Sequence, residues 1–185
     1  MIALTSKLMK NDKELQMQIQ TNRDDHRIAW LAALAITIHL LESVIPSPVP
    51  GLKPGLANII TIIVLCRFGI SIAVWVNLLR VIVGSLILGT FLSPTFILSL
   101  SGAISSLLVL ALASWISKHS FVHFSAMGYS LLAAMAHITG QFVIAYLLLI
   151  PHPAMWKLFP VLLSFAVLLG TVNGIISQNI LKRIL

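Results

Sequence analysis

Long apolar runs separated by short polar or proline-rich breaks dominate the chain. Apolar residues fill most positions in 28–45, 56–68, 70–91, 95–116, 122–150 and 160–181. Most of these runs approach or exceed the roughly 20 residues that an α-helix needs to cross a bilayer. Lipid cannot satisfy open backbone hydrogen bonds, so such runs are expected to be helical. The pattern predicts an all-α integral membrane protein, a bundle of about six transmembrane helices.

The breaks between the runs contain helix-ending residues. Prolines and a glycine at 46–51 end the first run, Ser93 and Pro94 separate the third from the fourth, and 151–153 ends the fifth. The run at 56–68 is short for a full crossing, so a tilted helix and a partly re-entrant segment both stay open. The chain thus divides into a polar arm at 1–27 and a transmembrane domain at 28–185.

Composition and charge support this reading. The chain is 58% hydrophobic and 9% charged, whereas soluble domains carry roughly a quarter charged residues. The meaning of its net charge of +7 depends on which side of the membrane the basic residues lie. Nine basic residues lie on the side of both termini, and two, Lys53 and Lys157, lie opposite. This bias predicts cytoplasmic termini and no nucleic-acid binding. The arm lacks the apolar core of a signal peptide, so the first run is expected to remain as an anchor.

Several polar residues interrupt the apolar runs. Arg80 lies near the middle of the third run, where insertion costs about 2.5 kcal/mol or more, so it should face the bundle interior. Asn77 lies on nearly the same helical face. Glu42 and Asn58 fall in the outer half of the bundle under this topology. In the fifth run, one face carries both His137 and Gln141.

One interpretation is a polar cavity open to the outside that binds a small molecule. The residues predicted to line it are Glu42, Asn58, Asn77, Arg80, His137 and Gln141. Lys53, in the proline- and glycine-rich loop at 46–55, would attract an anionic group to this cavity. The alternative is structural: Glu42 neutralises Arg80 in a buried pair, the amides join helices at about 0.6 kcal/mol per contact, and the loop is a rigid turn.

Motifs for catalysis and for metals are missing from the sequence. There is no nucleotide-binding glycine loop, and the aspartates Asp12, Asp24 and Asp25 all lie in the polar arm. A magnesium-diphosphate reaction would need clustered carboxylates. The histidines lack metal-ligand spacing, and the single Cys66 cannot form an internal disulfide. We therefore expect no enzyme activity, no catalytic residue, no metal and no cofactor.

Small residues recur four positions apart, a spacing that allows close helix packing in lipid. The pairs are Ala29 and Ala33, Ser85 and Gly89, Gly102 and Ser106, Ala136 and Gly140, and Gly170 and Gly174. Internal packing explains most of them. For Ala29 and Ala33, contact with another protein is the second interpretation.

Three segments together carry a family resemblance. They are GLKPGLANIIT at 51–61, RVIVGSLILGTFLSPTF at 80–96 and AHITGQ at 136–141. In this combination they resemble the Gx transporter family, which is also described as heptaprenyl diphosphate synthase component I. The resemblance covers about residues 41–174.

That family is similar to the S components of energy-coupling-factor transporters, small six-helix proteins with an extracellular substrate cavity. The resemblance implies a substrate-binding subunit for a small molecule in the bacterial cytoplasmic membrane. A membrane scaffold subunit and ATPases would be its partners. Ala29 and Ala33 resemble the docking face of S components, and an anionic substrate would suit Arg80 and Lys53.

Two other functions stay open from the sequence. One is a non-catalytic accessory subunit that presents lipid diphosphate to a partner synthase, and the charges suit it equally well. The other is a structural subunit of a membrane electron-transfer complex. Prenyl diphosphate synthases themselves resemble soluble helical enzymes with two aspartate-rich motifs, which this chain lacks. The residues do not identify the substrate.

Overall fold

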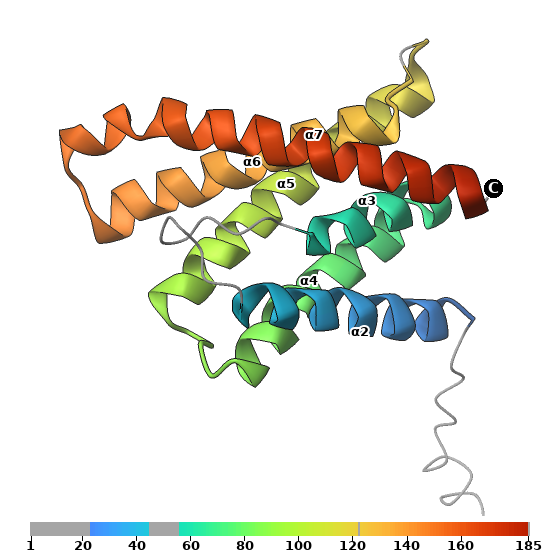
Figure 1. Cartoon of the computed structure of the whole chain (residues 1–185), viewed down its shortest axis with the longest axis horizontal. Helices are drawn as coiled ribbons and strands as arrows, with labels where there is room; N and C mark the ends of the chain where they lie inside the picture. Colours follow the sequence, from blue (N-terminus) through green and yellow to red (C-terminus); the bar gives the residue numbers. More distant parts are fainter. Residues whose placement is uncertain (1–22, 45–55, 122, 185) are drawn as a thin grey trace, which may run out of the picture.

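The structure is a computed structural model that describes residues 23–44, 56–121 and 123–184. Within these ranges the chain is helical and has no strand. Figure 1 shows the helices following one another back and forth along the bundle. They are α2 (Arg23–Val44), α3 (Ala57–Phe68), α4 (Ile70–Ile87), α5 (Pro94–His119), α6 (Ala126–Ile144) with a π-helical turn (Ala145–Leu149), a 3₁₀ turn (Pro153–Lys157) and α7 (Phe159–Ile184).

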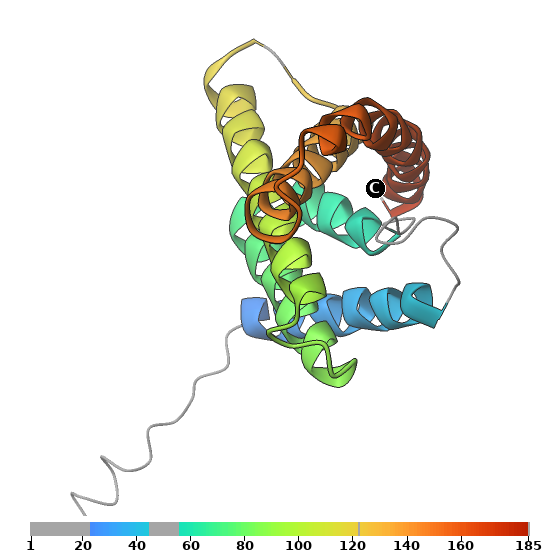
Figure 2. The same ribbon diagram turned by 90° about the vertical axis from the view of Figure 1, so that its left-hand side faces the viewer.

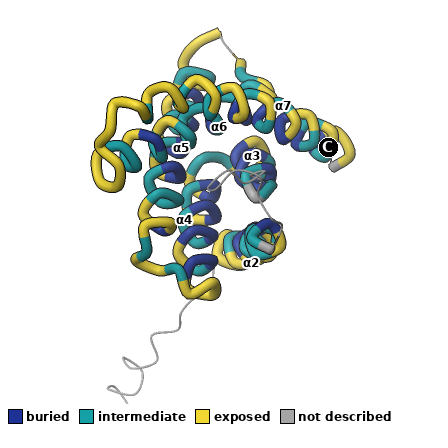
Figure 3. The backbone as a smooth tube through the Cα atoms, turned by 60° about the vertical axis from the view of Figure 1, so that its left-hand side comes forward, coloured by how far each residue is buried: buried dark blue, intermediate teal, exposed yellow. Residues whose placement is uncertain are grey.

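The all-α membrane fold is confirmed. Four helical stretches are long and apolar enough to cross a bilayer: Ile70–Ile87, Pro94–His119, Ala126–Leu149 and Pro153–Arg183. Large apolar side chains face outward, among them Leu108 at 66% and Leu168 at 63% exposure. Water would penalise such an apolar surface, whereas lipid tails accommodate it. Figure 3 shows this exposed surface along the outer sides of the helices.

Two helices fall outside that set of four. The 12 residues of α3 extend about 18 Å, well short of a hydrocarbon layer roughly 30 Å thick. The 22 residues of α2 are long enough, but the helix begins with the charged residues of 23–27. The sequence pattern assigns these residues to the polar arm. The structure instead makes them the first turn of α2, with Arg27 Nη1 donating to Asp24 Oδ1 at 3.1 Å.

The third helix ends earlier than its apolar run predicted. The run extends to Phe91, but α4 ends at Ile87 because Gly89 takes a left-handed φ of 67°. Thr90 N then donates to Ser85 O at 2.9 Å, which closes the helix end. Ser93 starts the next helix by accepting a hydrogen bond from Phe96 N, with Pro94 in the first turn.

A short helix occupies the centre of the bundle. α3 contacts α2, α4, α6 and α7, and its Ile62 and Val64 are almost fully buried. It reverses directly into α4 through Gly69, whose φ of 89° and ψ of 178° suit glycine alone. Figure 2 shows α3 lying between α2 and α7.

Glycines set the closest helix contacts in the other half of the bundle. A Cβ on Gly140 of α6 would lie 2.1 Å from Ser105 Oγ of α5, and one on Gly170 of α7 would lie 2.8 Å from Ala134 Cβ of α6. Ser130 of α6 donates a hydrogen bond to Gly170 O at 2.8 Å. The small-residue spacings at Gly140 and Gly170 therefore serve internal packing.

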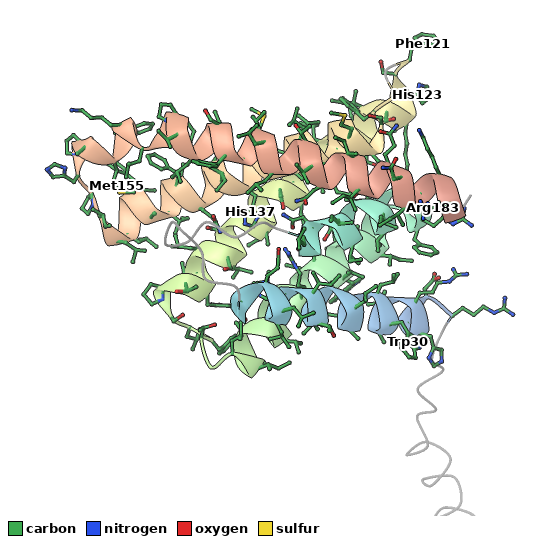
Figure 4. The ribbon with its side chains drawn as sticks, in the orientation of Figure 1. Trp30, Phe121, His123, His137, Met155 and Arg183 are labelled. Atoms are coloured by element: carbon green, nitrogen blue, oxygen red, sulfur yellow. The ribbon has the colours of Figure 1, made fainter. Side chains whose placement is uncertain are left out.

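The two ends of the bundle differ in charge. Figure 4 places Trp30, Phe121, His123 and Arg183 toward one end and Met155 at the other. The start of α2 and the last turns of α3, α5 and α7 share the first end (Figure 1). The basic residues there are Arg23, Arg27, Arg67, Lys118, Lys182 and Arg183, while Lys157 lies at the opposite end.

Candidate functional site

The centre of α4 carries a buried polar pair. Asn77 and Arg80 are three residues apart on one helical face, and only 1% and 5% of their surfaces are exposed. Arg80 Nη2 donates to Asn77 Oδ1 at 2.5 Å. The apolar helix therefore directs its one charged side chain into the bundle rather than into lipid.

The pair leaves two hydrogen-bond donors unused. Arg80 Nε and Asn77 Nδ2 are buried and have no partner among the described residues. Each unmet donor costs about 1–3 kcal/mol, and more when the group is charged. The hydrogen bond from Arg80 determines the orientation of the Asn77 side-chain amide. Exchanging its oxygen and nitrogen would place the Asn77 NH₂ group against the guanidinium N–H. The site thus has hydrogen-bonding capacity that the described protein atoms do not satisfy.

Glu42, near the end of α2, is the buried carboxylate close to this pair. It is 2% exposed, and its Oε1 accepts a hydrogen bond from Leu56 N at the start of α3. The carboxylate acts on Arg80 electrostatically, yet no direct ion pair between these two described side chains is present. Glu42 therefore supplies counter-charge at a distance and joins α2 to α3, rather than forming the predicted contact pair.

His137 and Gln141 reach the interior from α6. Both pack against Gly102 of α5: a Cβ there would lie 2.7 Å from His137 Cε1 and 2.8 Å from Gln141 Cγ. His137 also lies within electrostatic range of Arg80. Its Nδ1 is buried without a partner in the described part of the chain. Figure 4 places His137 midway along the bundle.

The other predicted residues lie elsewhere. Asn58 is half-buried at the start of α3, and within the described ranges Arg80 Nη2 donates to Asn77 rather than to Asn58. Lys53 and the loop at 45–55 fall outside the described residues. Ala29 and Ala33 are exposed on the outer face of α2, beside Trp30. The structure therefore brings together Glu42, Asn77, Arg80 and His137, with Gln141 next to His137.

Two buried hydroxyl groups were missed from the sequence. Thr61 of α3 and Ser177 of α7 are 3% and 0% exposed, and neither oxygen has a hydrogen-bond partner within the described ranges. The sequence spacing of each hydroxyl from a nearby asparagine could have identified both residues. Thr61 follows Asn58 by three residues and Ser177 follows Asn173 by four, so each shares a helical face with an intramembrane amide.

A separate cavity of about 690 Å³ lies between α5 and α6. None of the predicted site residues lines it, and two of its hydroxyls donate within their own helices: Ser101 to Leu98 O and Thr139 to Met135 O, both at 2.8 Å. Its surface is therefore apolar. In the polar cluster, by contrast, Glu42, Asn77 and Arg80 are buried. The open polar cavity expected from the sequence stays a prediction.

The comparison with known families covers almost all of this bundle. Residues 31–180 match the family described as Heptaprenyl diphosphate synthase component I. The chain belongs to this family. Glu42, Asn77, Arg80 and His137 all fall inside the matched region of the heptaprenyl diphosphate synthase component I family. No curated protein and no solved structure matches the chain.

The family description names a synthase component, and the carboxylates can be compared with that description. Among the described residues, Glu42 is the one buried carboxylate, while Asp24 and Asp25 are exposed in the first turn of α2. No group of three histidine, cysteine or acidic residues in the described ranges could hold a metal ion. Within the described residues the buried cluster therefore contains a single carboxylate, Glu42.

Proposed function

We propose that this protein is the membrane-embedded substrate-binding subunit of a small-molecule transporter, energised by partner subunits. The observation that carries the proposal is the buried Arg80–Asn77 pair with its unused donors. Burying a guanidinium at mid-membrane depth is costly, and intramembrane ionisable groups mark substrate pathways. A purely structural pair would be expected to meet its own hydrogen bonds.

The end-to-end charge difference supports an orientation for this subunit. We assign the end with Arg23, Arg67, Lys118 and Arg183 to the cytoplasm, since loops rich in lysine and arginine stay on that side. Both termini are then cytoplasmic, in the inner membrane of a bacterium. The chain has no nucleotide-binding motif, so a scaffold subunit and ATPases would supply the energy.

The outer face of α2 is the proposed docking surface for the scaffold. Ala29 and Ala33 are exposed there between Trp30 and Leu34, which are 79% and 49% exposed. Small residues four apart let another helix approach closely. The resemblance of the segments at 51–61, 80–96 and 136–141 to the Gx transporter family, and of that family to S components, supports the same arrangement.

A non-catalytic accessory role in prenyl diphosphate synthesis is the second candidate. The family description favours it, because it names a component of heptaprenyl diphosphate synthase. In this role the Arg80 cluster would hold a lipid diphosphate for a partner synthase. The two candidates differ in what is bound and which partners assemble with the chain.

Native mass spectrometry of the protein purified in mild detergent tests the proposal. We expect wild-type protein and an Arg183→Ala control to carry the same small molecule, and a folded Arg80→Gln variant to lose it. Co-purifying ATPases would favour transport, whereas a prenyl diphosphate with a soluble synthase would favour the second candidate. Equal ligand retention by Arg80→Gln and wild type would contradict both assignments of the site.

A further inference from the structure

The unused hydrogen-bonding atoms at the centre of α4 have a defined polarity. Arg80 Nε and Asn77 Nδ2 can only donate, since neither a guanidinium nor an amide nitrogen accepts hydrogen bonds. The acceptor oxygen of Asn77 is already used by Arg80 Nη2. Whatever completes this pair must therefore provide acceptors.

The described protein atoms do not provide those acceptors. Glu42 is the nearby carboxylate, but its Oε1 accepts from Leu56 N, and it reaches Arg80 only electrostatically. His137 packs against Gly102 of α5. Neither group accepts a hydrogen bond from Arg80 Nε or Asn77 Nδ2, because both of these nitrogens lack a partner among the described residues.

The two donors lie on adjacent parts of one hydrogen-bonded unit. Since Arg80 Nη2 is hydrogen-bonded to Asn77, the guanidinium is held with its Nε side free. A guanidinium recognises oxyanions with paired N–H groups, and such charge-assisted bonds are the stronger class. A neutral carbonyl would accept the same bonds without balancing the charge.

Resting on the ligand-binding role proposed above, we infer that the ligand presents an oxyanion, a carboxylate or a phosphate, to Arg80 and Asn77. The oxyanion accepts from Arg80 Nε and Asn77 Nδ2, while Glu42 keeps its bond to Leu56 N. The substrate class is therefore an organic acid or a phosphate ester, and a cationic substrate is excluded from this position.

The substitution Asn77→Asp tests this inference with little change in shape. It keeps an oxygen for Arg80 Nη2 and replaces the Nδ2 donor with a negatively charged oxygen. Asn179→Asp, which adds the same charge at an exposed position of α7, is the matched control. The probes are inorganic phosphate and acetate, with chloride and N-methylacetamide at matched concentration and ionic strength. Their binding is measured as the shift in thermal unfolding of the full chain in nanodiscs.

We expect phosphate or acetate to stabilise wild type and Asn179→Asp above chloride. Asn77→Asp should bind that anion at least about tenfold more weakly, the loss expected when a hydrogen bond to a charged group is replaced by repulsion. A preference for phosphate indicates a phosphate ester, and one for acetate indicates an organic acid. Should Asn77→Asp fail to fold, Arg80→Lys keeps the charge, removes the Nε donor and should weaken binding in the same direction.

Three results would overturn the inference. They are an equal anion effect in Asn77→Asp and wild type, stabilisation of wild type by N-methylacetamide alone, and no stabilisation of wild type by any probe. The identity of the co-purified molecule separates this inference from the proposed function. A bound cation or uncharged molecule lost in Arg80→Gln leaves the proposed function standing and refutes the oxyanion class.

Discussion

At the scale of single residues, the hydrogen bonding of Arg80 is the observation behind the proposed ligand-binding interior. Polar side chains that join helices in a membrane use their hydrogen bonds on one another. Ser130 does this with Gly170 O. Arg80 and Asn77 instead form one hydrogen bond with each other, and the donor nitrogens Arg80 Nε and Asn77 Nδ2 have no partner among the described residues. The contrast within one bundle is the reason to assign them a binding role.

Glu42 gives a first prediction at this scale. Glu42→Gln keeps an oxygen that can accept from Leu56 N, whereas Glu42→Leu removes it; both lose the charge that acts on Arg80. We expect Glu42→Leu to be less stable than Glu42→Gln by about 1–3 kcal/mol, the cost of an unmet buried donor. Unfolding in mixed detergent micelles measures the difference. Equal stabilities would show that the bond to Leu56 N does not hold α2 to α3.

Ser130 gives a second prediction. Ser130→Ala removes a buried hydrogen bond between α6 and α7, and we expect it to destabilise the fold by about 0.6–1.5 kcal/mol. Ser164→Ala is the control, because Ser164 is exposed and donates within its own helix to Pro160 O. The same unfolding assay compares them. A larger effect at Ser164 would contradict the assigned contact.

At the scale of elements, the packing of α5 against α6 depends on glycine. Gly102 leaves room for His137 and Gln141, and Gly140 leaves room for Ser105. The absence of a side chain at Gly102 lets His137 lie against α5, and His137 is within electrostatic range of Arg80. The apolar cavity between the same helices lies on the face lined by Ala136 and Thr139.

Gly140→Ala tests this contact. Its Cβ would meet Ser105 Oγ at 2.1 Å and Ser101 O at 2.9 Å, so we expect destabilisation of about 1–3 kcal/mol. Gly128→Ala is the control in the same helix, because its nearest neighbour lies at 3.6 Å and alanine favours helix by up to about 1 kcal/mol. Thermal unfolding of both variants in detergent should move in opposite directions. Equal destabilisation would show that the α5–α6 contact is looser than described.

Much of this fold could be predicted from hydropathy, because apolar run length determines where helices cross lipid. The end of α4 could not, because Leu88 and Phe91 continue the apolar run, while Gly89 takes a left-handed conformation that hydropathy does not register. Arg80 was predictable as a buried cation. The absence of a direct contact between Arg80 and Glu42 could not be predicted. It depends on the three-dimensional position of Leu56 N, which donates to the Glu42 carboxylate. Thr61 and Ser177 were missed because single hydroxyls hardly change an apolar run.

At the scale of the whole molecule, charge distribution and helix order point to one orientation. The described chain begins and ends at the same end of the bundle (Figure 1), and six basic residues gather there. The opposite end carries Lys157 and an aromatic cluster of Phe142, Tyr146, Trp156 and Phe159. Aromatic rings favour the membrane–water interface, so this cluster marks the outer boundary of the bundle under the proposed orientation.

Cysteine labelling tests the orientation. In a Cys66→Ser background, we expect a membrane-impermeant maleimide to label Lys157→Cys in intact spheroplasts and to label Lys118→Cys only after permeabilisation. The Cys66→Ser parent controls for background labelling. Labelling of Lys118→Cys in intact spheroplasts would contradict the assigned topology, because it would place the last turn of α5 outside the cell.

The most direct test of the central claim is a high-resolution electron cryomicroscopy structure of the full chain in nanodiscs with its co-purified molecule retained. The account predicts non-protein density within hydrogen-bond distance of Arg80 Nε and Asn77 Nδ2, with Glu42 still on Leu56 N. A structure in which Glu42 or another protein group occupies both donors, and no such density is present, would contradict it.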